Sequence, residues 1–482
     1  MKRSLAVFLS AILLVALVGC GSNARKPIEL TLSTEDSETI LRAAGIVLPE
    51  ASEVAAAGTT IQWINFHDPF HNYKETEKVN TGYWTFKTKY GCEIQWIETT
   101  WETNADTLAQ LIISGDPPDF TQAGEGIFPS GAIKGQYQPV DPYINYDDPL
   151  YKDMKTFAYD YYSLDGHPYF IINDMSFNKV VIYNRRVIEE YGYDDPADLY
   201  ANDEWTWDNF YEMCVDFSDA DSDRYALDGW FFPAGIMHSS GTTIVTYDPE
   251  ENKFVSNVDD PRLERAETLL YELNKNECTY PISDNGWTVR DGVEGKGLKD
   301  GNMLFYIAGT YAFTGPVEDV SALIGDMEKQ EVMLVPLPRD DNGDGRYYIE
   351  SEPVGYCIIK DARNPEGVAL FSSCERFKVI DPLVESIEVK QLREIYLWTD
   401  EMLDMYDECY RLASELASSG EAIVLYGDGL GTANSAASQF ETQGFVAGGA
   451  QSWAQLKEQN ADRLDALLAE LNETIANFEY TP

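Results

Sequence analysis

The first part of the chain alternates between short apolar runs and longer amphipathic stretches. Residues 61–66 form a compact, mainly apolar run that ends before Pro69, and residues 93–98 alternate between apolar and polar side chains. A helical pattern follows each run, and the second one begins at Asn104 and ends at Gly115. Short apolar or alternating runs predict strands, and a 3.6-residue repeat closed by glycine predicts a helix. The order strand, helix, strand, helix predicts a parallel sheet in an α/β fold.

A second apolar run occupies residues 303–307 and is followed at once by Gly309 and Tyr311. A short apolar run bounded by glycines predicts a buried strand whose end opens into a loop. Ligands of α/β sheets bind at the carboxyl ends of such strands. Tyr311 is therefore a candidate for ligand contact, and the alternative is that it is a half-buried packing aromatic.

Several helices are marked by their first residues. Ser452 and Gln455 have the spacing of a capping box, and an apolar stripe follows them. Thr206 precedes a helical pattern as an N-cap, and Asn364 with Pro365 gives an N-cap followed by proline at the first helical position. The C-terminal stripe predicts a helix that packs on a core.

The N-terminus carries a basic start and a short apolar run. Lys2 and Arg3 precede an uncharged run from residue 4 to 19, which is too short to span a membrane and predicts a secretory signal. The sequence Leu-Val-Gly before Cys20 resembles the bacterial lipoprotein signal, in which that cysteine becomes the lipidated first residue. An acyl anchor on Cys20 would hold the protein outside the cytoplasmic membrane. The alternative is an unmodified cysteine in an ordinary signal peptide.

The net charge limits the partners of the mature chain. The chain has 82 acidic and 35 basic residues, and loss of Lys2 and Arg3 leaves 33 basic residues and a net charge of −49. This balance argues against binding to nucleic acid or electrostatic docking on anionic lipid. Hydrophobic residues at 44% and aromatic residues at 13% exclude a disordered acidic chain. The length is sufficient for two lobes with separate cores.

Six cysteines remain after Cys20, and their spacing is wide and irregular. No pair has metal-site or small-loop spacing, so the pattern favours buried, mostly unpaired thiols, although disulfides are possible in an exported protein. They are Cys92, Cys214, Cys278, Cys357, Cys374 and Cys409.

The most diagnostic short motif is SGDPPDF at residues 114–120, where a helix stop meets a proline-stiffened turn and the next strand. This stretch closely resembles the SGD-x-PD signature of the family 1 extracellular solute-binding proteins. Other segments resemble that family in the same order along the chain. They are QPVDPYI at 138–144, IYN at 182–184, TWDNF at 206–210, Gly295-Lys296 with Met303, GTY at 309–311, VPLP at 335–338 and NPE at 364–366.

The resemblance implies a periplasmic-binding-protein-like type II fold, with two α/β lobes, a ligand cleft and three crossings between the lobes. It places the crossings near Phe177, near Pro338 and at residues 412–420. The expected organisation is a signal peptide at 1–19, a tether at 20–59, an N-terminal lobe at 60–176 plus 338–412 and a C-terminal lobe at 177–337 plus 413–482.

The same resemblance implies a function. It predicts a monomeric, lipid-anchored receptor on the outer face of the bacterial cytoplasmic membrane, which captures a sugar or oligosaccharide and delivers it to the permease of an ABC importer. Two positions depart from the family. Tyr311 stands where many members have tryptophan, and residues 121–125 offer no aromatic ring where maltose-binding protein has one. These departures argue against maltodextrin itself as the ligand.

Sugar recognition points to particular residue types. The apolar faces of sugar rings stack on aromatic side chains, and their hydroxyls need planar polar partners. The aromatic candidates are Tyr311, Trp230, Phe231 and Phe232. The polar candidates, placed at strand ends or near the second crossing, are Asn65, Asp68, Gln122, Glu125 and Glu352.

An acidic loop is a weak calcium candidate. Asp340, Asn342 and Asp344 occupy positions 1, 3 and 5 of a calcium-loop pattern, but the nearest glutamates fall at positions 11 and 13 rather than 12. Acidic residues are also common in ordinary turns. No other cofactor is expected.

The chain is expected to have no enzymatic activity, because it lacks the serine-elbow, zinc-helix and phosphate-loop motifs. Other functions remain open from sequence. The ligand could be a peptide, a polyamine or a sugar acid, although an anion would require a basic residue that the candidate set lacks. A surface glycosidase or a carbohydrate-binding adhesin is a further alternative.

Overall fold

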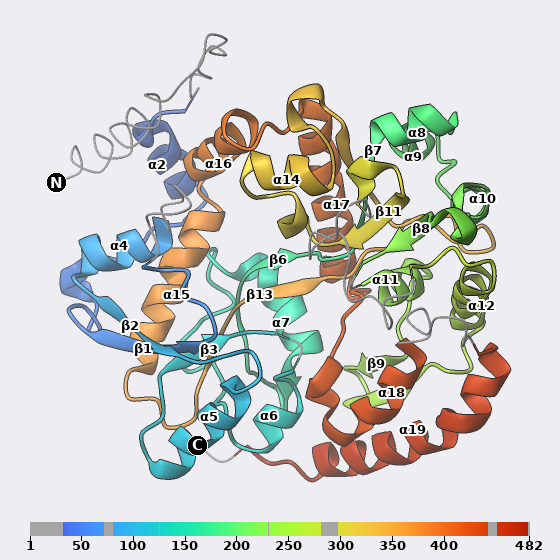
Figure 1. Cartoon of the computed structure of the whole chain (residues 1–482). Coiled ribbons are helices and arrows are strands. Elements are labelled where there is room, and N and C mark those ends of the chain that lie inside the picture. The colour runs from blue at the N-terminus through green and yellow to red at the C-terminus, as the bar shows by residue number, and fades with distance from the viewer. Residues whose placement is uncertain are drawn as a thin grey trace.

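The computed structural model describes residues 32–71, 81–124, 126–229, 231–280, 297–441 and 451–480. The predicted signal peptide with Cys20, the ligand candidates Glu125 and Trp230, and Gly295-Lys296 lie outside these ranges. Two mixed sheets, each covered by helices, form the body of the protein (Figure 1). The α/β fold class predicted from sequence is therefore what the structure shows.

The first sheet has the strand order β2-β1-β3-β13-β6. Strand β1 runs parallel to β2 and β3, as the sequence pattern predicts, and β13 runs antiparallel to β3 and β6. The carboxyl ends of β1, β2, β3 and β6 therefore share one edge with the start of β13. The strands are β1 (Thr60–Asn65), β2 (Glu93–Glu98), β3 (Phe120–Gln122), β6 (Ile171–Ser176) and β13 (Glu352–Ile358).

The second sheet has the order β12-β7-β11-β8. Strand β11, predicted from its apolar run, lies between β7 and β8, and all six of its residues are buried. The register pairs Val180 with both Ala308 and Pro336, so the ends of β8, β11 and β12 share an edge with the start of β7. The strands are β7 (Val180–Asn184), β8 (Tyr225–Asp228), β11 (Met303–Ala308) and β12 (Val332–Pro336).

Short chain segments connect the two sheets. Residues 177–179 lead from β6 to β7, and residues 337–351 lead from β12 back to β13. Both segments leave from the sheet edges just described, so these edges face each other. The lobe boundaries and the third crossing remain predictions.

Helices pack on both sheets, and two small hairpins complete the strands. The hairpins are β4 (Ser163–Leu164) with β5 (His167–Pro168), and β9 (Val245–Asp248) with β10 (Lys253–Ser256). The helices that precede β11 in the chain are α2 (Thr34–Ala43), α4 (Thr81–Tyr90), α5 (Asn104–Ser114), α6 (Ser130–Ile133), α7 (Lys155–Tyr161), α8 (Arg185–Tyr191), α9 (Pro196–Ala201), α10 (Trp207–Phe217), α11 (Phe232–Ser239) and α12 (Pro261–Lys275). The later ones are α14 (Val317–Leu323), α15 (Pro365–Val379), α16 (Pro382–Glu394), α17 (Asp400–Ser419), α18 (Asn434–Glu441) and α19 (Trp453–Ala476).

The predicted helix ends are confirmed. Gly115 has a φ of 75°, the left-handed conformation that ends α5. Thr206 caps α10, Asn364 accepts a hydrogen bond from the backbone N–H of Gly367, and Ser452 forms a capping box with α19. These ends were predictable because a cap depends on residues within one helical turn.

Asp119 explains part of the SGDPPD motif. Its side chain is 3% exposed. One carboxylate oxygen accepts a hydrogen bond of 2.8 Å from the backbone N–H of Gln62 in β1, and the other accepts one of 2.9 Å from Asn364 at the start of α15. The motif therefore joins the first sheet to the helix that covers it.

The predicted tether is partly folded. Within it, α2 packs against α16, and Ser37 donates a hydrogen bond of 2.6 Å to Asp381. Leu48 and Ala56 are buried, and Lys89 and Tyr90 of α4 donate to backbone carbonyls at Leu48 and Pro49. The described part of this segment thus belongs to the folded body, because its apolar residues are buried there. The polar composition of the segment did not indicate this packing.

The six cysteines after Cys20 are all free and buried. Among the helices of the described residues, none is long and apolar enough to cross a membrane.

Candidate functional site

A group of side chains lies where the chain passes between the two sheets. We call Asn178, Lys179, Glu350, Glu352 and Tyr311 the junction cluster. The ammonium of Lys179 lies 3.4 Å from Glu350 and 3.8 Å from Glu352. The Asn178 backbone N–H donates to Glu350, and its side-chain amide donates to Glu352. The cluster therefore joins the first crossing segment to the second.

Lys179 and Glu350 form the buried part of the cluster, since 1% of each side chain is exposed. Burial by itself would raise the pKa of the Glu350 carboxyl, but nearby Lys179, and then His238, hold this pKa below its usual range. Burial lowers the pKa of His238, whose Nδ1 lies 3.9 Å from Glu350. The buried charges are thus a carboxylate and an ammonium that compensate each other.

Glu352 and Tyr311 form the accessible part of the cluster. The Glu352 side chain is 35% exposed, and Tyr311 is 44% exposed in a turn (Thr310–Ala312) directly after β11. A Cβ atom placed on Gly309 would lie 2.7 Å from both the Tyr311 ring and the Asn178 side chain. Glycine at this position therefore lets the ring fold back beside Asn178. The structure brings two of the predicted residues, Tyr311 and Glu352, to one place.

Two adjacent phenylalanines have different environments. Phe231 is partly exposed, and the Lys179 ammonium lies 5.1 Å from the centre of its ring. Phe232 begins α11 and has no exposed surface. The prediction that Phe232 offers its ring to a ligand is therefore wrong, because the helix turns that side chain into the core.

Asn65 and Gln122 lie at the carboxyl edge of the first sheet, as predicted. Asn65 is 3% exposed, accepts a hydrogen bond from the Phe66 backbone and donates one of 3.5 Å to the exposed Gln122 side chain. Asp68 is 6% exposed, and its carboxylate accepts from the backbone N–H groups of Phe70 and His71. Asp68 therefore stabilises a turn, whereas Gln122 is available at the surface.

Two aromatic residues at the same edge were missed from sequence. Phe66 directly follows β1 and Trp101 follows β2; they are 42% and 74% exposed. Their ring centres are 5.2 Å apart in an edge-to-face arrangement. The two contacting rings form an exposed apolar patch, and such patches can mark sites of ligand or partner binding. The available sequence signal was the place of each residue just after a strand end.

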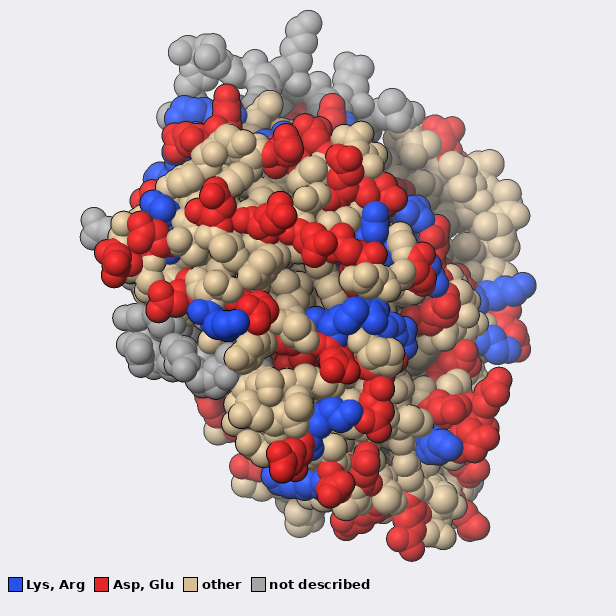
Figure 2. All heavy atoms as spheres, turned by 90° about the vertical axis from the view of Figure 1, so that its right-hand side faces the viewer, with Lys and Arg blue, Asp and Glu red and all other residues tan. Residues whose placement is uncertain are grey.

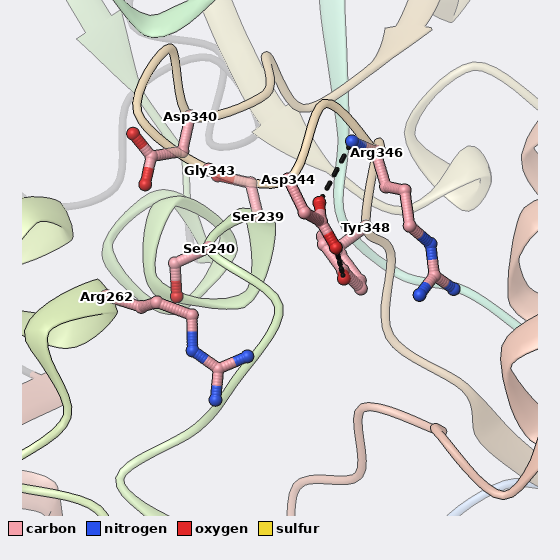
Figure 3. Close-up of a pocket in the computed structure, with 8 residues that line it drawn as sticks. All are labelled: Ser239, Ser240, Arg262, Asp340, Gly343, Asp344, Arg346 and Tyr348. Atoms are coloured by element: carbon pink, nitrogen blue, oxygen red, sulfur yellow. Dashed lines mark hydrogen bonds between the residues drawn. The ribbon is translucent and has the colours of Figure 1, made fainter.

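The carboxylates of Asp340 and Asp344 in the acidic loop do not converge on one point. Asp340 is 4% exposed and forms an ion pair of 2.6 Å with Arg265, while Asp344 accepts hydrogen bonds from the Arg346 backbone and the Tyr348 hydroxyl. Figure 3 shows the carboxylates of Asp340 and Asp344 pointing apart. Across the described ranges, no three His, Cys, Asp or Glu side chains are placed to hold a metal ion.

A cavity of about 210 Å³ lies beside this loop (Figure 3). Its two arginines have partners, because Arg262 pairs with Asp260 and Arg346 with Glu421. Among the described residues, none of those predicted to contact the solute lines it. Its lining is Ser239, Ser240, Arg262, Asp340, Gly343, Asp344, Arg346 and Tyr348.

Comparison with known proteins assigns the chain to a family. The model of a family described as bacterial extracellular solute-binding protein matches residues 70–372. The chain belongs to this family. A search of curated protein sequences finds no match.

Solved structures of solute-binding proteins share the fold at low sequence identity. The GacH receptor of Streptomyces glaucescens, solved without ligand and with acarbose, has 12% identity and a TM-score of 0.59 over 86% of this chain and 99% of that one. The sugar-binding protein MalE of Xanthomonas citri has 16% identity and a TM-score of 0.58 over 87% and 100%. A substrate-binding protein of Listeria monocytogenes in complex with cycloalternan has 17% identity and a TM-score of 0.57 over 85% of this chain and 99% of that one. These similarities confirm the type II periplasmic-binding-protein-like fold.

The facing edges of this solute-binding protein carry complementary chemistry. The first sheet offers the exposed rings of Phe66 and Trp101 with the Gln122 amide, and the junction offers Tyr311 with the Glu352 carboxylate. Rings can cover apolar ligand faces, while the amide and carboxylate can hydrogen-bond to hydroxyl or amine groups. Such an arrangement suits binding of a polar solute with apolar faces.

Proposed function

We propose that this protein is a lipid-anchored receptor that captures a sugar or oligosaccharide between its two lobes and delivers it to an ABC importer. The observation that carries the proposal is the pairing of exposed aromatic rings with polar groups on two facing sheet edges. The family and the carbohydrate complexes of structurally similar proteins support it.

The anchor and the cellular location rest on the N-terminal sequence. A basic start, a short apolar run and Leu-Val-Gly before Cys20 support cleavage and acylation at that cysteine. Mass spectrometry of the membrane fraction should detect an acylated N-terminal peptide beginning at Cys20. Release of the Cys20→Ala protein into the medium would support the anchor, and unchanged membrane retention would contradict it.

Ligand capture can be tested by thermal shift on the chain from residue 32 onward. A panel of mono- and oligosaccharides, amino acids, peptides and polyamines should show stabilisation by saccharides, by roughly 2.7 kcal/mol at a hundredfold excess over Kd. A shift caused by a polyamine or peptide, with every saccharide silent, would contradict the proposal.

The proposal is capture without turnover. A saccharide that stabilises the protein should be recovered intact by chromatography after long incubation. Recovery of hydrolysed fragments would instead support a surface glycosidase.

A further inference from the structure

The exposed rings of Phe66 and Trp101 lie at the side of the first sheet that is remote from the crossing segments. Phe66 directly follows β1, and Trp101 follows β2, the outermost strand of the order β2-β1-β3-β13-β6. The segments that cross to the second sheet are attached to β6 and β13 (Figure 1). Because adjacent strands lie about 4.8 Å apart, the three spacings from β1 to β6 amount to roughly 14 Å. The rings are therefore well separated from the place where the two sheets are joined.

Hydrogen bonds hold the turn that carries Trp101. The Thr99 backbone N–H donates a hydrogen bond of 3.2 Å to the Asn65 carbonyl, and the Thr99 hydroxyl donates one of 2.8 Å to Asn104 at the start of α5. The planes of the Phe66 and Trp101 rings meet at 80°, so the two rings form a corner whose faces point in two directions. A corner that is already formed before binding loses little conformational freedom when a ligand covers it.

Polar groups flank this corner on the neighbouring strands. Glu98 is the last residue of β2, pairs in register with Asn65 and is exposed. Gln122 is the last residue of β3, and its exposed side chain accepts the hydrogen bond from Asn65. A carboxylate and an amide beside two rings suit a sugar, which has an apolar ring face and hydroxyls around its rim.

The charge of the chain disfavours a second copy of the protein as the partner that covers the rings. The formal net charge is −47, and Figure 2 shows acidic side chains spread over the face on the right of Figure 1, with smaller basic groups among them. A charge this far from zero makes copies of the chain repel each other, but it does not oppose the approach of a neutral saccharide.

The position of the rings bears on the length of the ligand. Trp101 is 74% exposed and Phe66 is 42% exposed, whereas binding sites for small ligands bury most of the ligand surface. A single sugar unit held beside the crossing segments would not reach rings that are three strand spacings away. A chain of several sugar units can extend from the crossing segments to these rings.

We infer that Phe66 and Trp101 form an outer subsite, which stacks on a sugar unit remote from the crossing segments and makes the receptor prefer oligosaccharides to monosaccharides. This inference rests on the proposed function and goes beyond it, because it specifies the length of the ligand and the residues that select it. A stacking ring adds affinity only for a ligand long enough to cover it.

The test measures affinity against ligand length by titration calorimetry, in those of the malto-, cello-, xylo- and manno-oligosaccharide series that give a thermal shift. The wild-type protein should bind the tetrasaccharide at least tenfold more tightly than the monosaccharide. Trp101→Ala and Phe66→Ala should each weaken tetrasaccharide binding about tenfold and leave the affinity for the shortest member that binds nearly unchanged. Ile113→Ala removes another exposed apolar side chain (86% exposed), near the C-terminal end of α5, and should change neither affinity.

Hydroxyl-radical footprinting of the wild-type protein provides a second measurement that needs no variant. Saturating tetrasaccharide should lower the oxidation of Trp101 about fivefold, and saturating monosaccharide should leave it nearly unchanged, because only the longer ligand covers the ring. Affinity independent of length, an equal loss at every length in Trp101→Ala, or undiminished oxidation of Trp101 under tetrasaccharide would overturn the inference and leave sugar capture standing. Silence of every saccharide would overturn both.

Discussion

Lys179 and Glu350 lie on different segments that connect the two sheets, and their charged groups approach to 3.4 Å with 1% of each side chain exposed. The second segment also contacts α17 and the residues that follow it, because Ser351 donates a backbone hydrogen bond of 2.8 Å to Ile423 and a side-chain hydrogen bond to Ala413. If the lobes close on ligand by a hinge, as the fold implies, this ion pair lies where the segments must bend.

Removing one member of this pair should destabilise the protein strongly. Lys179→Met leaves Glu350 buried without its ammonium partner, which should cost about 3–5 kcal/mol of unfolding free energy in urea titrations. Adding Glu350→Gln to the same chain should recover part of that loss. Lys155→Met, which breaks an exposed pair with Asp147, should leave the unfolding free energy nearly unchanged. A loss for Lys179→Met as small as that of this control would show that the buried pair contributes little.

The exposed rings should contribute to ligand affinity and not to folding. Tyr311→Ala and Trp101→Ala should each weaken saccharide binding by at least about 1 kcal/mol, because a stacking ring is lost. Tyr311→Phe keeps the ring and should retain most of the affinity. Calorimetry of the variants measures these effects, and the melting temperature of the ligand-free proteins is the control. Unchanged affinity in Tyr311→Ala would remove that ring from the site.

The two aspartates of the SGDPPD motif should differ in their effect on stability. Asp119→Ala leaves two backbone N–H groups without their acceptor in a buried place, which should cost roughly 2–4 kcal/mol. Asp116→Ala removes a 63% exposed partner of Arg363 and should cost less than about 1 kcal/mol. Urea denaturation of both variants tests this difference. Equal losses would show that the buried hydrogen bonds of Asp119 contribute no more than the exposed ion pair of Asp116.

Glu267 should make stability depend on pH. Its side chain has no exposed surface, and within the described residues neither carboxylate oxygen has a hydrogen-bond partner. Burial, with a smaller effect of Glu441, raises its pKa from 4.5 to about 8. As the pH rises, the unfolded chain therefore releases this proton at a lower pH than the folded protein does. The contribution of Glu267 to the free energy of unfolding is fully present below pH 4.5 and is lost as the pH rises through 8.

Glu267→Gln should remove this dependence. The variant should exceed the wild type in unfolding free energy by on the order of 3 kcal/mol at pH 8, with little difference at pH 4.5. Glu264→Gln changes an exposed acid on the same helix and is the matched control. Parallel pH profiles of Glu267→Gln and the wild type would contradict the expected role of the buried carboxyl.

The sequence determined the parts of this protein that depend on neighbouring residues. The strand at 93–98, the buried strand after residue 302 and the caps at Gly115, Thr206 and Ser452 were all predictable, because periodicity and capping act within a few residues. The SGDPPD motif also pointed to the family, whose model matches the chain. Tyr311 was predicted from its place just after a strand, and Glu352 from its place near the second crossing.

Only the tertiary structure decided which of these residues meet. Asn178 and Glu350 are 172 positions apart, and no local pattern indicates that they share a hydrogen bond. Phe231 and Phe232 are adjacent and chemically identical, yet the start of α11 buries only the second completely. Trp101 has no periodic partner, and its contact with Phe66 emerges only because the ends of β1 and β2 lie side by side. The pairing of strands within the sheets determines these contacts. That pairing depends on how the whole chain packs, because the sequence around one residue does not specify the strand that will lie next to it.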